Sequence, residues 1–428
     1  MNYLETLKYF EALERVGIKL GLETIKKLLF LSGNPESELN FIHIAGTNGK
    51  GSTAAFMAEI LKTSGYRVGL YTSPHLVRFE ERISVNGKLI SEERLAKLAT
   101  YYRDLIEKEK DFSPTFFEVT TALAFKYFAE EKVKIGIMEV GMGGRLDATN
   151  VIKPEVAVIT KLSQDHVQYL GQRLSDIAGE KFSIIKPGVA VVAGVDQKIL
   201  KEKLKEICAG NKNPLTLLGE NIQYRLFKSD LTGQEFEVKG ERFKIKLLGL
   251  HQLDNAALAI AGVEILRERG YNITLAHLRG GLEKTDWPGR FEVAGTKPYI
   301  ILDGAHNLEA VKKLKEALGY YFPKKGIVLV LGIMADKNWP LMVRILTPLA
   351  RLVITGQVAG ERACPSEKLG HEALRFTKEV IMCPSIREAL ATALDRASEV
   401  EVICVTGSLY VVGEAKQALE DGRRVERS

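Results

Sequence analysis

The chain has 428 residues, of which 46% are hydrophobic and 27% are charged, and its formal net charge is +6. A chain of this length is too long to fold around one ordinary hydrophobic core, so we expect a soluble globular protein with two domains. The modest charge suits anionic substrates, but no basic run interleaved with aromatic residues favours nucleic acid as a partner. The sequence shows no apolar run of membrane-spanning length, no secretory signal and no paired cysteine spacing, which predicts a cytoplasmic protein with reduced thiols and no membrane partner.

Helical and strand-like patterns alternate along the first two thirds of the chain. Residues 2–31 carry helical patterns with a break between 17 and 23. Beyond them, apolar runs lie at 41–45, 67–71, 135–140, 156–160 and 189–193, and helical patterns at 52–64, 91–109, 115–130 and 252–269. Asn86-Gly87 predicts a hairpin, and the charged stretch 220–246 predicts added short strands. The alternation indicates an α/β fold with a mostly parallel sheet covered on both faces.

A second series of strands and helices follows a cluster of turn residues. Gly280-Gly281 and Trp287-Pro288-Gly289 punctuate the chain, and the new apolar runs lie at 299–302, 327–331, 352–355, 379–382 and 402–406. We therefore predict a domain boundary near residue 290. The first domain, 1–290, would hold a P-loop-type sheet, and the second, 291–428, would be a smaller Rossmann-like α/β domain.

The segment Gly46-Thr-Asn-Gly-Lys-Gly-Ser52 lies between a predicted strand and a predicted helix. This layout cradles nucleotide phosphates, because backbone N–H groups, a helix N-terminus and a lysine approach the oxygens. It departs from the Walker A string, since Gly51 stands where Ser or Thr would hold Mg²⁺ and Gly46 is too close to Lys50. The sequence predicts nucleotide binding, with the metal-binding hydroxyl elsewhere.

Three other strand ends carry polar residues. Glu139 ends an apolar run before a glycine-rich segment, Asp165-His166 follow the next run, and Asp303-Gly-Ala-His-Asn307 repeats the pattern in the second domain. Carboxylates at such strand tips hold Mg²⁺ in nucleotide-binding folds. Each segment also has a simpler interpretation. Glu139 would then be an exposed glutamate and Asp165-His166 a polar loop, while the third segment would be a turn in which Asn307 caps the next helix. Lys181 lies in a helical pattern and by default would be solvated.

Together these segments resemble the folylpolyglutamate synthase/dihydrofolate synthase family of the Mur ligase superfamily. The motifs that carry the resemblance, in the family's order, are Gly46-Thr-Asn-Gly-Lys-Gly-Ser52, Thr72-Ser-Pro-His75, Glu139-Val-Gly-Met-Gly-Gly-Arg-Leu-Asp147, Asp165-His166 with Leu170-Gly171, and Asp303-Gly-Ala-His-Asn307. The resemblance extends from Leu20-Gly-Leu-Glu23 to Thr406-Gly-Ser408. It implies a Mur-type ATP-binding domain over 1–290 and a glutamate-ligase domain over 291–428.

The resemblance implies an ATP-dependent ligase that joins L-glutamate to folates and to dihydropteroate. The γ-phosphate of ATP would pass to the substrate carboxylate, and the glutamate amine would then attack the acyl phosphate. Each step moves negative charge, so positioned cations, including two Mg²⁺ ions, would supply much of the acceleration. The implied partners are these small molecules alone, and the implied assembly is a monomer.

The resemblance implies a role for each residue of this chain that matches a functional residue of the family. The implied ATP-binding residues are Asn48, Gly49, Lys50, Gly51, Ser52, Asn255, Arg290 and Asp303. Ser73, Glu139 and His166 would bind metal, and the catalytic residues would be Lys50, His166 and Lys181. The folate or pteroate would lie against Phe116, Phe117, Leu146, Asp147 and Ala148, and the incoming glutamate near His306 and Ser408. Phe116 and Phe117 could equally belong to the core.

Lys181 matches the family's carbamylated lysine, which CO₂ converts from a cation into a carboxylate-like ligand. The family usually reads Glu-Lys-Ala-Gly, whereas here Glu180-Lys181 is followed by Phe182-Ser183, a departure from the family's pattern. Two other functions are considered. A cell-wall Mur ligase is disfavoured by the folate-type Thr72-Ser-Pro-His75 segment, and a nucleotide switch without ligase chemistry would make the matched motifs incidental.

Overall fold

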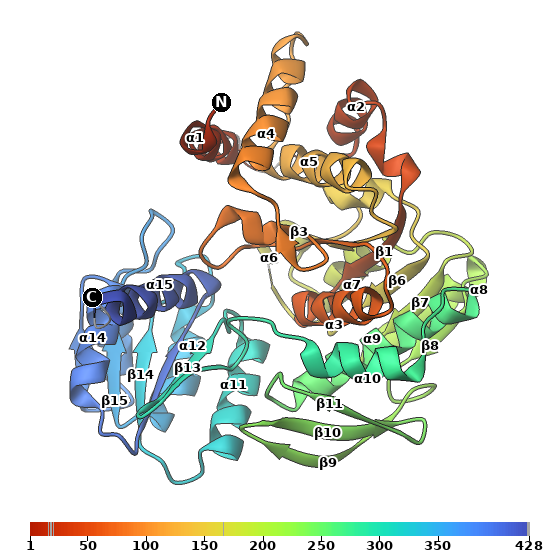
Figure 1. The fold of residues 1–428 in the computed structure, drawn as a ribbon. Helices are drawn as coiled ribbons and strands as arrows, with labels where there is room; N and C mark the ends of the chain where they lie inside the picture. Colours follow the sequence, from red (N-terminus) through yellow and green to blue (C-terminus); the bar gives the residue numbers. More distant parts are fainter. Residues whose placement is uncertain (16, 18, 20, 166, 426–428) are drawn as a thin grey trace.

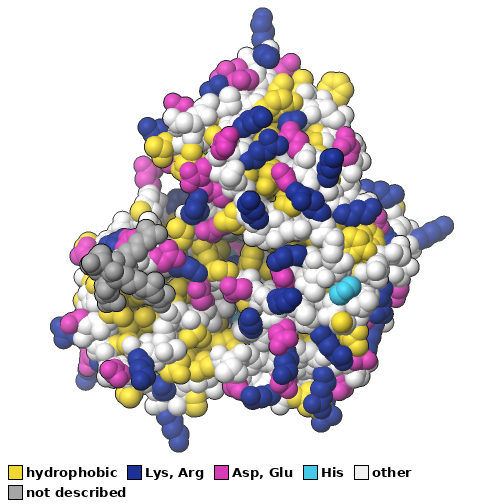
Figure 2. All heavy atoms as spheres, viewed as in Figure 1, with side chains coloured by type: hydrophobic (Ala, Val, Ile, Leu, Met, Phe, Trp, Pro, Cys, Tyr) yellow, Lys and Arg dark blue, Asp and Glu magenta, His cyan; other side chains and the backbone are white. Residues whose placement is uncertain are grey.

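The computed structural model describes residues 1–425 except residues 16, 18, 20 and 166. Figure 1 shows two sheets, each flanked by helices, and a small third sheet at the bottom of the view. The C-terminal part of the chain, drawn in blue, forms a lobe beside the larger N-terminal part. Figure 2 shows that positive and negative side chains are intermingled over this face.

The larger sheet has eight strands. Their spatial order is β4 (Lys88–Leu89), β3 (Ile83–Val85), β2 (Val68–Tyr71), β5 (Ile135–Glu139), β1 (Asn40–Ala45), β6 (Val156–Ile159), β7 (Ala190–Ala193) and β8 (Leu215–Leu217). Pairing is parallel from β2 to β8, and β3 and β4 form an antiparallel edge around the predicted hairpin. The carboxyl ends of β1, β2, β5 and β6 therefore lie along one edge.

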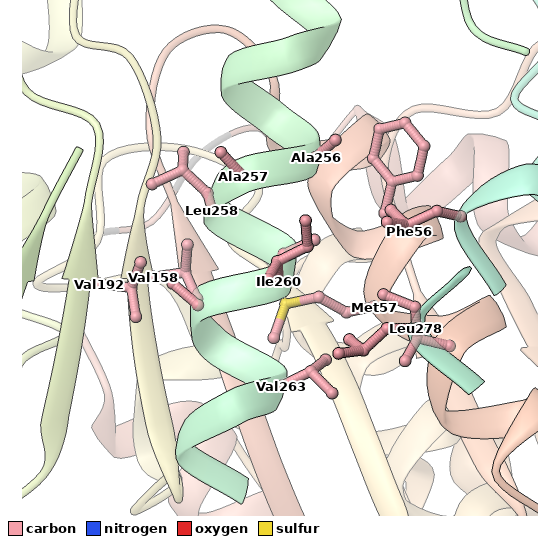
Figure 3. Packing of buried hydrophobic residues seen from close by; sticks show 14 of the residues in the cluster. Phe56, Met57, Val158, Val192, Ala256, Ala257, Leu258, Ile260, Val263 and Leu278 are labelled. Atoms are coloured by element: carbon pink, nitrogen blue, oxygen red, sulfur yellow. The ribbon is translucent and has the colours of Figure 1, made fainter. Parts of the chain in front are cut away.

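One face of this sheet is covered by α3 (Lys50–Thr63) and α9 (His251–Glu268), with α10 (Leu275–Lys284) packed on α3. Ile42 and Ile44 of β1 point to this face, which is the period-2 alternation of a strand. In Figure 3, Met57 of α3 lies between α9 and Leu278 of α10. This packing holds the N-terminus of α3 against the end of β1.

The opposite face is covered by two groups of helices. They are α1 (Tyr3–Glu14), α2 (Glu23–Leu31), α4 (Glu92–Glu107) and α5 (Phe116–Glu130), and then α7 (Leu174–Phe182) and α8 (Lys198–Gly210), while the short helix α6 (Val167–Leu170) contacts α7. Phe41 and Ala45 of β1 alternate with Ile42 and Ile44 and point to this side. Thr115 and Glu118 form a capping box, which explains why α5 begins at Phe116.

The second sheet has six strands, in the order β12 (Glu292–Thr296), β13 (Tyr299–Asp303), β17 (Val402–Thr406), β14 (Ile327–Leu331), β15 (Leu352–Thr355) and β16 (Val380–Met382). All pairs are parallel except β12 with β13. Its helices are α11 (Leu308–Tyr321), α12 (Trp339–Leu346) and α13 (Ser366–Ala373) on one face, and α14 (Ile386–Arg396) and α15 (Leu409–Val425) on the other.

The charged stretch 220–246 forms the predicted short strands, β9 (Tyr224–Asp230), β10 (Gly233–Val238) and β11 (Glu241–Ile245), in one antiparallel sheet. Short 3₁₀ turns are η1 (Pro35–Glu38), η2 (Phe79–Arg82), η3 (Ala148–Val151) and η4 (Thr347–Leu349). Within the described chain, no helix is both long and apolar enough to cross a bilayer.

The α/β prediction is confirmed, and three details differ from the sequence patterns. Helix α3 begins at Lys50 and not at Ser52, because Gly49 takes a left-handed conformation (φ 92°) as its N-cap. β8 and β12 were not predicted, since one has three residues and the other is a half-buried edge strand containing a glycine. The domain boundary near residue 290 stays a prediction.

Candidate active site

A cleft of 1070 Å³ lies between the carboxyl ends of the strands of the two large sheets. Ligands bind at this edge in open α/β sheets. All predicted site residues that the structure describes line it: Asn48, Gly49, Lys50, Gly51, Ser52, Ser73, Phe116, Phe117, Glu139, Leu146, Asp147, Ala148, Lys181, Asn255, Arg290, Asp303, His306 and Ser408. The remaining predicted residue, His166, lies outside the described residues. The cleft thus gathers segments far apart in the chain.

The phosphate loop is held tightly between β1 and α3. Thr47 N and Asn48 N both donate to the carbonyl of Lys161, at 2.8 and 3.3 Å. A Cβ at Gly49 would lie 2.3 Å from Asn255 Oδ1, and one at Gly51 would lie 2.9 Å from Trp287 Nε1. The loop therefore needs glycine at both positions. The indole of Trp287 occupies the side where a larger residue at position 51 would project.

Lys50 and Glu139 meet beneath this loop. Lys50 Nζ lies 3.8 Å from Glu139 Oε1 and donates to the carbonyl of Thr47 at 3.3 Å. Ser73 N donates to Glu139 Oε2 at 3.3 Å. Burial raises the pKa of Glu139, and the nearby Lys50 and the Ser73 amide partly oppose this shift. A buried carboxylate beside a lysine and a phosphate loop is suited to binding a cation.

The residues present fit a Mg²⁺ ion that is shared with phosphates. The hydroxyl of Ser73 and the carboxylate of Glu139 are oxygen donors, which Mg²⁺ prefers, and this ion usually takes few protein ligands. Among the described residues, no group of three or more His, Cys, Asp and Glu could hold a metal ion. The donor set therefore matches a phosphate-bound metal better than an all-protein cage.

Lys181 reaches the phosphate loop from helix α7. Its side chain is buried, and Nζ donates to the carbonyl of Gly46 at 2.9 Å. Burial, together with the charge of Lys50, lowers the pKa of Lys181 to about 7. The default expectation of a solvated lysine is therefore wrong. Near neutral pH a substantial fraction of this amine is uncharged, which is the form that reacts with CO₂.

The predicted acceptor side combines aromatic rings with a polar turn. Phe116 and Phe117 are half-buried and line the cleft, while Phe116 also packs edge-on against Phe10 of the core. The rings therefore line the cleft and also pack on the core, and their contact with a folate stays a prediction. Asp147 accepts hydrogen bonds from Met142 N and from both N and Oγ1 of Thr149.

A buried histidine supports this turn from β1. His43 Nε2 lies 2.8 Å from Thr149 Oγ1, which itself lies 2.5 Å from Asp147 Oδ1. Burial lowers the pKa of His43 to about 3, so its ring is neutral. Since the Thr149 hydroxyl donates to Asp147, it accepts from His43, which places the proton on Nε2. His43 escaped the sequence argument because it looks like any other residue of a buried strand.

The second sheet supplies the other wall. Asp303 ends β13 and accepts from Phe291 N and Ala305 N at 2.9 and 3.0 Å. His306 Nε2 lies 3.6 Å from Asp165 Oδ2, so these two strand-tip motifs do meet. Ser408 Oγ accepts from Val411 N, at the start of α15, and so caps that helix as well as lining the cleft.

Two cationic residues of the cleft were missed by the sequence argument. Lys337 Nζ lies 2.7 Å from Asp165 Oδ1, and it follows β14 in a polar turn of the kind that marked the other sites. Arg82 lines the cleft beside the loop of Ser73. Its position at the end of a 3₁₀ turn gave no signal in the sequence.

A phosphate-type loop, a buried carboxylate and a cleft between two α/β sheets define a nucleotide-dependent ligase of the Mur type. The family described as "Mur ligase middle domain" matches residues 44–263, and "Mur ligase, glutamate ligase domain" matches residues 289–409. The chain belongs to the folylpolyglutamate synthase/dihydrofolate synthase family of the Mur ligases, as its relatives show.

Two curated relatives cover almost all of the chain. The dihydrofolate synthase/folylpolyglutamate synthase of Bacillus subtilis (strain 168) is 34% identical over 98% of this chain and 99% of its own length. The folylpolyglutamate synthase of Lacticaseibacillus casei is 35% identical over 99% of this chain and 100% of its own length.

Solved structures agree with this assignment. The folylpolyglutamate synthase of Thermotoga maritima superposes with a TM-score of 0.86 at 35% identity, covering 98% of this chain and 97% of its own. The Mycobacterium tuberculosis folylpolyglutamate synthase complexed with ADP gives 0.88 at 31% identity, with coverage of 97% and 98%. Escherichia coli FolC in complex with DHPP and ADP gives 0.85 at 28% identity, with 98% of both chains covered.

Proposed function

We propose that the protein adds L-glutamate to folates and to dihydropteroate, using ATP and an acyl-phosphate intermediate. The observation that carries this proposal is the single cleft in which the phosphate loop, the Phe116–Asp147 side and the second sheet meet. Family membership adds support, because the Bacillus subtilis relative is named for both activities and the Lacticaseibacillus casei relative for folylpolyglutamate synthesis.

Binding of ATP would fall to the phosphate loop and three residues around it. The N–H groups of the loop, the N-terminus of α3 and Lys50 would hold the phosphates. Asn255, Arg290 and Asp303 would contact the rest of the nucleotide. Ser73 and Glu139 would hold Mg²⁺, whose charge neutralises the phosphate oxygens when it is bound. A second Mg²⁺ would need His166.

Lys181 would act next to this centre. Its lowered pKa leaves part of the amine neutral, and reaction with CO₂ would turn it into a carbamate with two oxygen donors. The carbamate would place a negative charge beside Lys50, the cation of the phosphate loop. His306 and Ser408 would bind the incoming glutamate, whose amine would attack the activated carboxylate within the cleft.

Closure of the two lobes about residue 290 would exclude water from the acyl phosphate. The proposal rests on a site built from both sheets, with Asp303 and His306 on one side and Lys50 on the other. One chain supplies all these residues, so a monomer would be sufficient. Solution scattering with ATP and folate should show compaction; unchanged dimensions would refute closure.

The decisive experiment is ATP-dependent incorporation of labelled L-glutamate, run in parallel with dihydropteroate and tetrahydrofolate. Incorporation with both would establish a bifunctional enzyme, and incorporation with one alone would name the single activity. Incorporation with neither, despite bound ATP, would favour a nucleotide switch, or a cell-wall Mur ligase if UDP-linked acceptors were used. Lys50→Met, which removes the phosphate contact, serves as the inactive control.

A further inference from the structure

Arg82 is a buried arginine on the acceptor side of the cleft that the proposed function leaves unused. It ends the turn η2 and directly precedes β3, which pairs with β2 so that Ile83 faces Tyr71. Thr72 N donates to the carbonyl of Arg82 at 3.0 Å. The side chain is 6% exposed and lines the cleft next to the loop of Ser73. The sheet therefore fixes its position.

The guanidinium of Arg82 has few hydrogen-bond partners among the described residues. Its Nε donates to His75 Nδ1 at 2.8 Å, and its Cζ lies 5.7 and 5.2 Å from the rings of Phe79 and Phe116. Burial lowers the pKa of His75 to about 4, so this partner is a neutral acceptor. Arg82 forms no ion pair with any residue that the structure describes. The N–H groups on Nη1 and Nη2 are thus left for a ligand.

Two other cations of the cleft, unlike Arg82, have a carboxylate partner. Lys337 is paired with Asp165 at 2.7 Å, and Lys50 lies 3.8 Å from Glu139. A buried charge without a close partner is costly, and arginine is almost never fully buried unless it is paired. Glu14 and Glu139 act on the charge of Arg82 but form no ion pair with it. The planar fork of arginine matches the two oxygens of a carboxylate, which makes this anion the best fit.

We propose that Arg82 binds a carboxylate of the acceptor substrate. This inference rests on the proposed function, which puts the acceptor against Phe116 and the metal at Ser73 and Glu139. Arg82 contacts the ring of Phe116 and lies beside the Ser73 loop, so it stands between these two places. The carboxylate is either the reacting one, of which dihydropteroate and folates each carry one, or the α-carboxylate that only folates carry.

The test compares Arg82→Gln and Arg82→Lys with the wild-type protein. KM for dihydropteroate, tetrahydrofolate, ATP and L-glutamate is measured together with the Kd of each acceptor, which needs no turnover. Arg78→Gln is the matched control, because Arg78 precedes the same turn but pairs with Glu80 and Glu92 and does not line the cleft. Thermal unfolding of each variant reports whether the fold is kept.

We expect Arg82→Gln to raise the acceptor KM and Kd by about 10- to 100-fold, the loss typical of a charge-assisted pair, with ATP and L-glutamate nearly unchanged. A rise for both acceptors identifies the reacting carboxylate, and a rise for tetrahydrofolate alone identifies the α-carboxylate. Unchanged acceptor binding, or a loss confined to ATP or L-glutamate, overturns the inference. If Arg82→Gln does not fold, Arg82→Lys decides, because it loses the fork and should raise the acceptor KM several-fold.

Failure of the proposed function gives a different result. If the wild-type protein bound tetrahydrofolate without incorporating glutamate, the ligase function would be refuted. The Kd measurements would still test whether Arg82 binds the acceptor. An active wild-type enzyme whose Arg82→Gln variant keeps its acceptor constants would refute only the role of Arg82. A protein that binds neither acceptor would overturn both.

Discussion

Asn48 of the phosphate loop and Asn307 of the second sheet's first helix pair their amides across the cleft. Asn307 Nδ2 donates to Asn48 Oδ1 at 2.9 Å, and Asn48 Nδ2 donates to Asn307 Oδ1 at 3.3 Å. Asn307 Oδ1 also accepts from Ala310 N, so the predicted cap of α11 is confirmed. One asparagine therefore both starts a helix and connects the two lobes at the nucleotide loop.

The amide pair predicts energetic coupling between the lobes. Asn48→Ala removes the pair and a hydrogen bond to Ser163 Oγ. Asn307→Ala removes the pair, a hydrogen bond to Asp165 Oδ2 and the helix cap, and loss of the cap should cost about 0.5–2 kcal/mol more in the free energy of unfolding. A double-mutant cycle in denaturant should give a coupling energy of about 0.5–1.5 kcal/mol. Strict additivity of the two substitutions would show that the pair contributes nothing. ATP affinity should fall in both single variants.

The tight packing of the phosphate loop predicts that Gly46 cannot be replaced. Gly46 has φ 156°, and an added Cβ would lie 1.8 Å from Thr160 Oγ1. Gly65→Ala is the control, because Gly65 has φ 86° but open space around it. The control should cost about 1 kcal/mol from backbone strain. Gly46→Ala should cost several times more and abolish ATP binding; equal costs would contradict the packing argument.

The lowered pKa of Lys181 predicts a pH-dependent carbamate. The neutral amine reacts with CO₂, and its fraction grows as pH rises through about 7. At fixed dissolved CO₂, isotopically labelled carbamate at Lys181 should increase from about pH 6 to about pH 8, as detected by carbon NMR. Lys181→Arg should lose the signal. Label that is absent at every pH would refute the modification and leave Lys181 as a donor to Gly46.

The same pKa shift predicts how stability depends on pH. The pKa of Lys181 is lowered from 10.5 in an unfolded chain to about 7 in the fold. Between these values the unfolded chain binds more protons, so this group's contribution to stability rises with pH. Lys181→Met should therefore stabilise the protein most below about pH 7 in CO₂-free buffer, by a few kcal/mol. A stabilisation that did not change with pH would contradict the assignment.

The chain from His43 through Thr149 to Asp147 predicts different outcomes for two substitutions of the histidine. His43→Gln keeps a donor near the position of Nε2, whereas His43→Leu leaves the Thr149 hydroxyl without one and should cost about 1–3 kcal/mol in stability. We expect the Leu variant to raise the acceptor KM more than kcat falls, because Asp147 loses its support. Equal kinetics for the two variants would show that His43 is only a packing residue.

The sequence by itself determined the α/β fold, most strands and helices, and a set of motifs that all fall in one cleft. It could do so because buried parallel strands are continuous apolar runs and because phosphate loops demand glycines in a fixed order. The resemblance of the motifs to one family assigned the roles. The sequence was also sufficient to place Asn307 at the start of a helix, since capping is a local interaction.

Only the tertiary structure decided which neighbours each polar group has. The need for glycine at position 51 is explained by Trp287, which is distant in sequence. The pKa of Lys181 is lowered because burial and the charge of Lys50 act on it together. Arg82 is informative because none of the described carboxylates forms an ion pair with it, although Glu14 and Glu139 act on its charge, and no local pattern can reveal this. Burial and electrostatics depend on every segment packed around a group, so they appear only once the chain has folded.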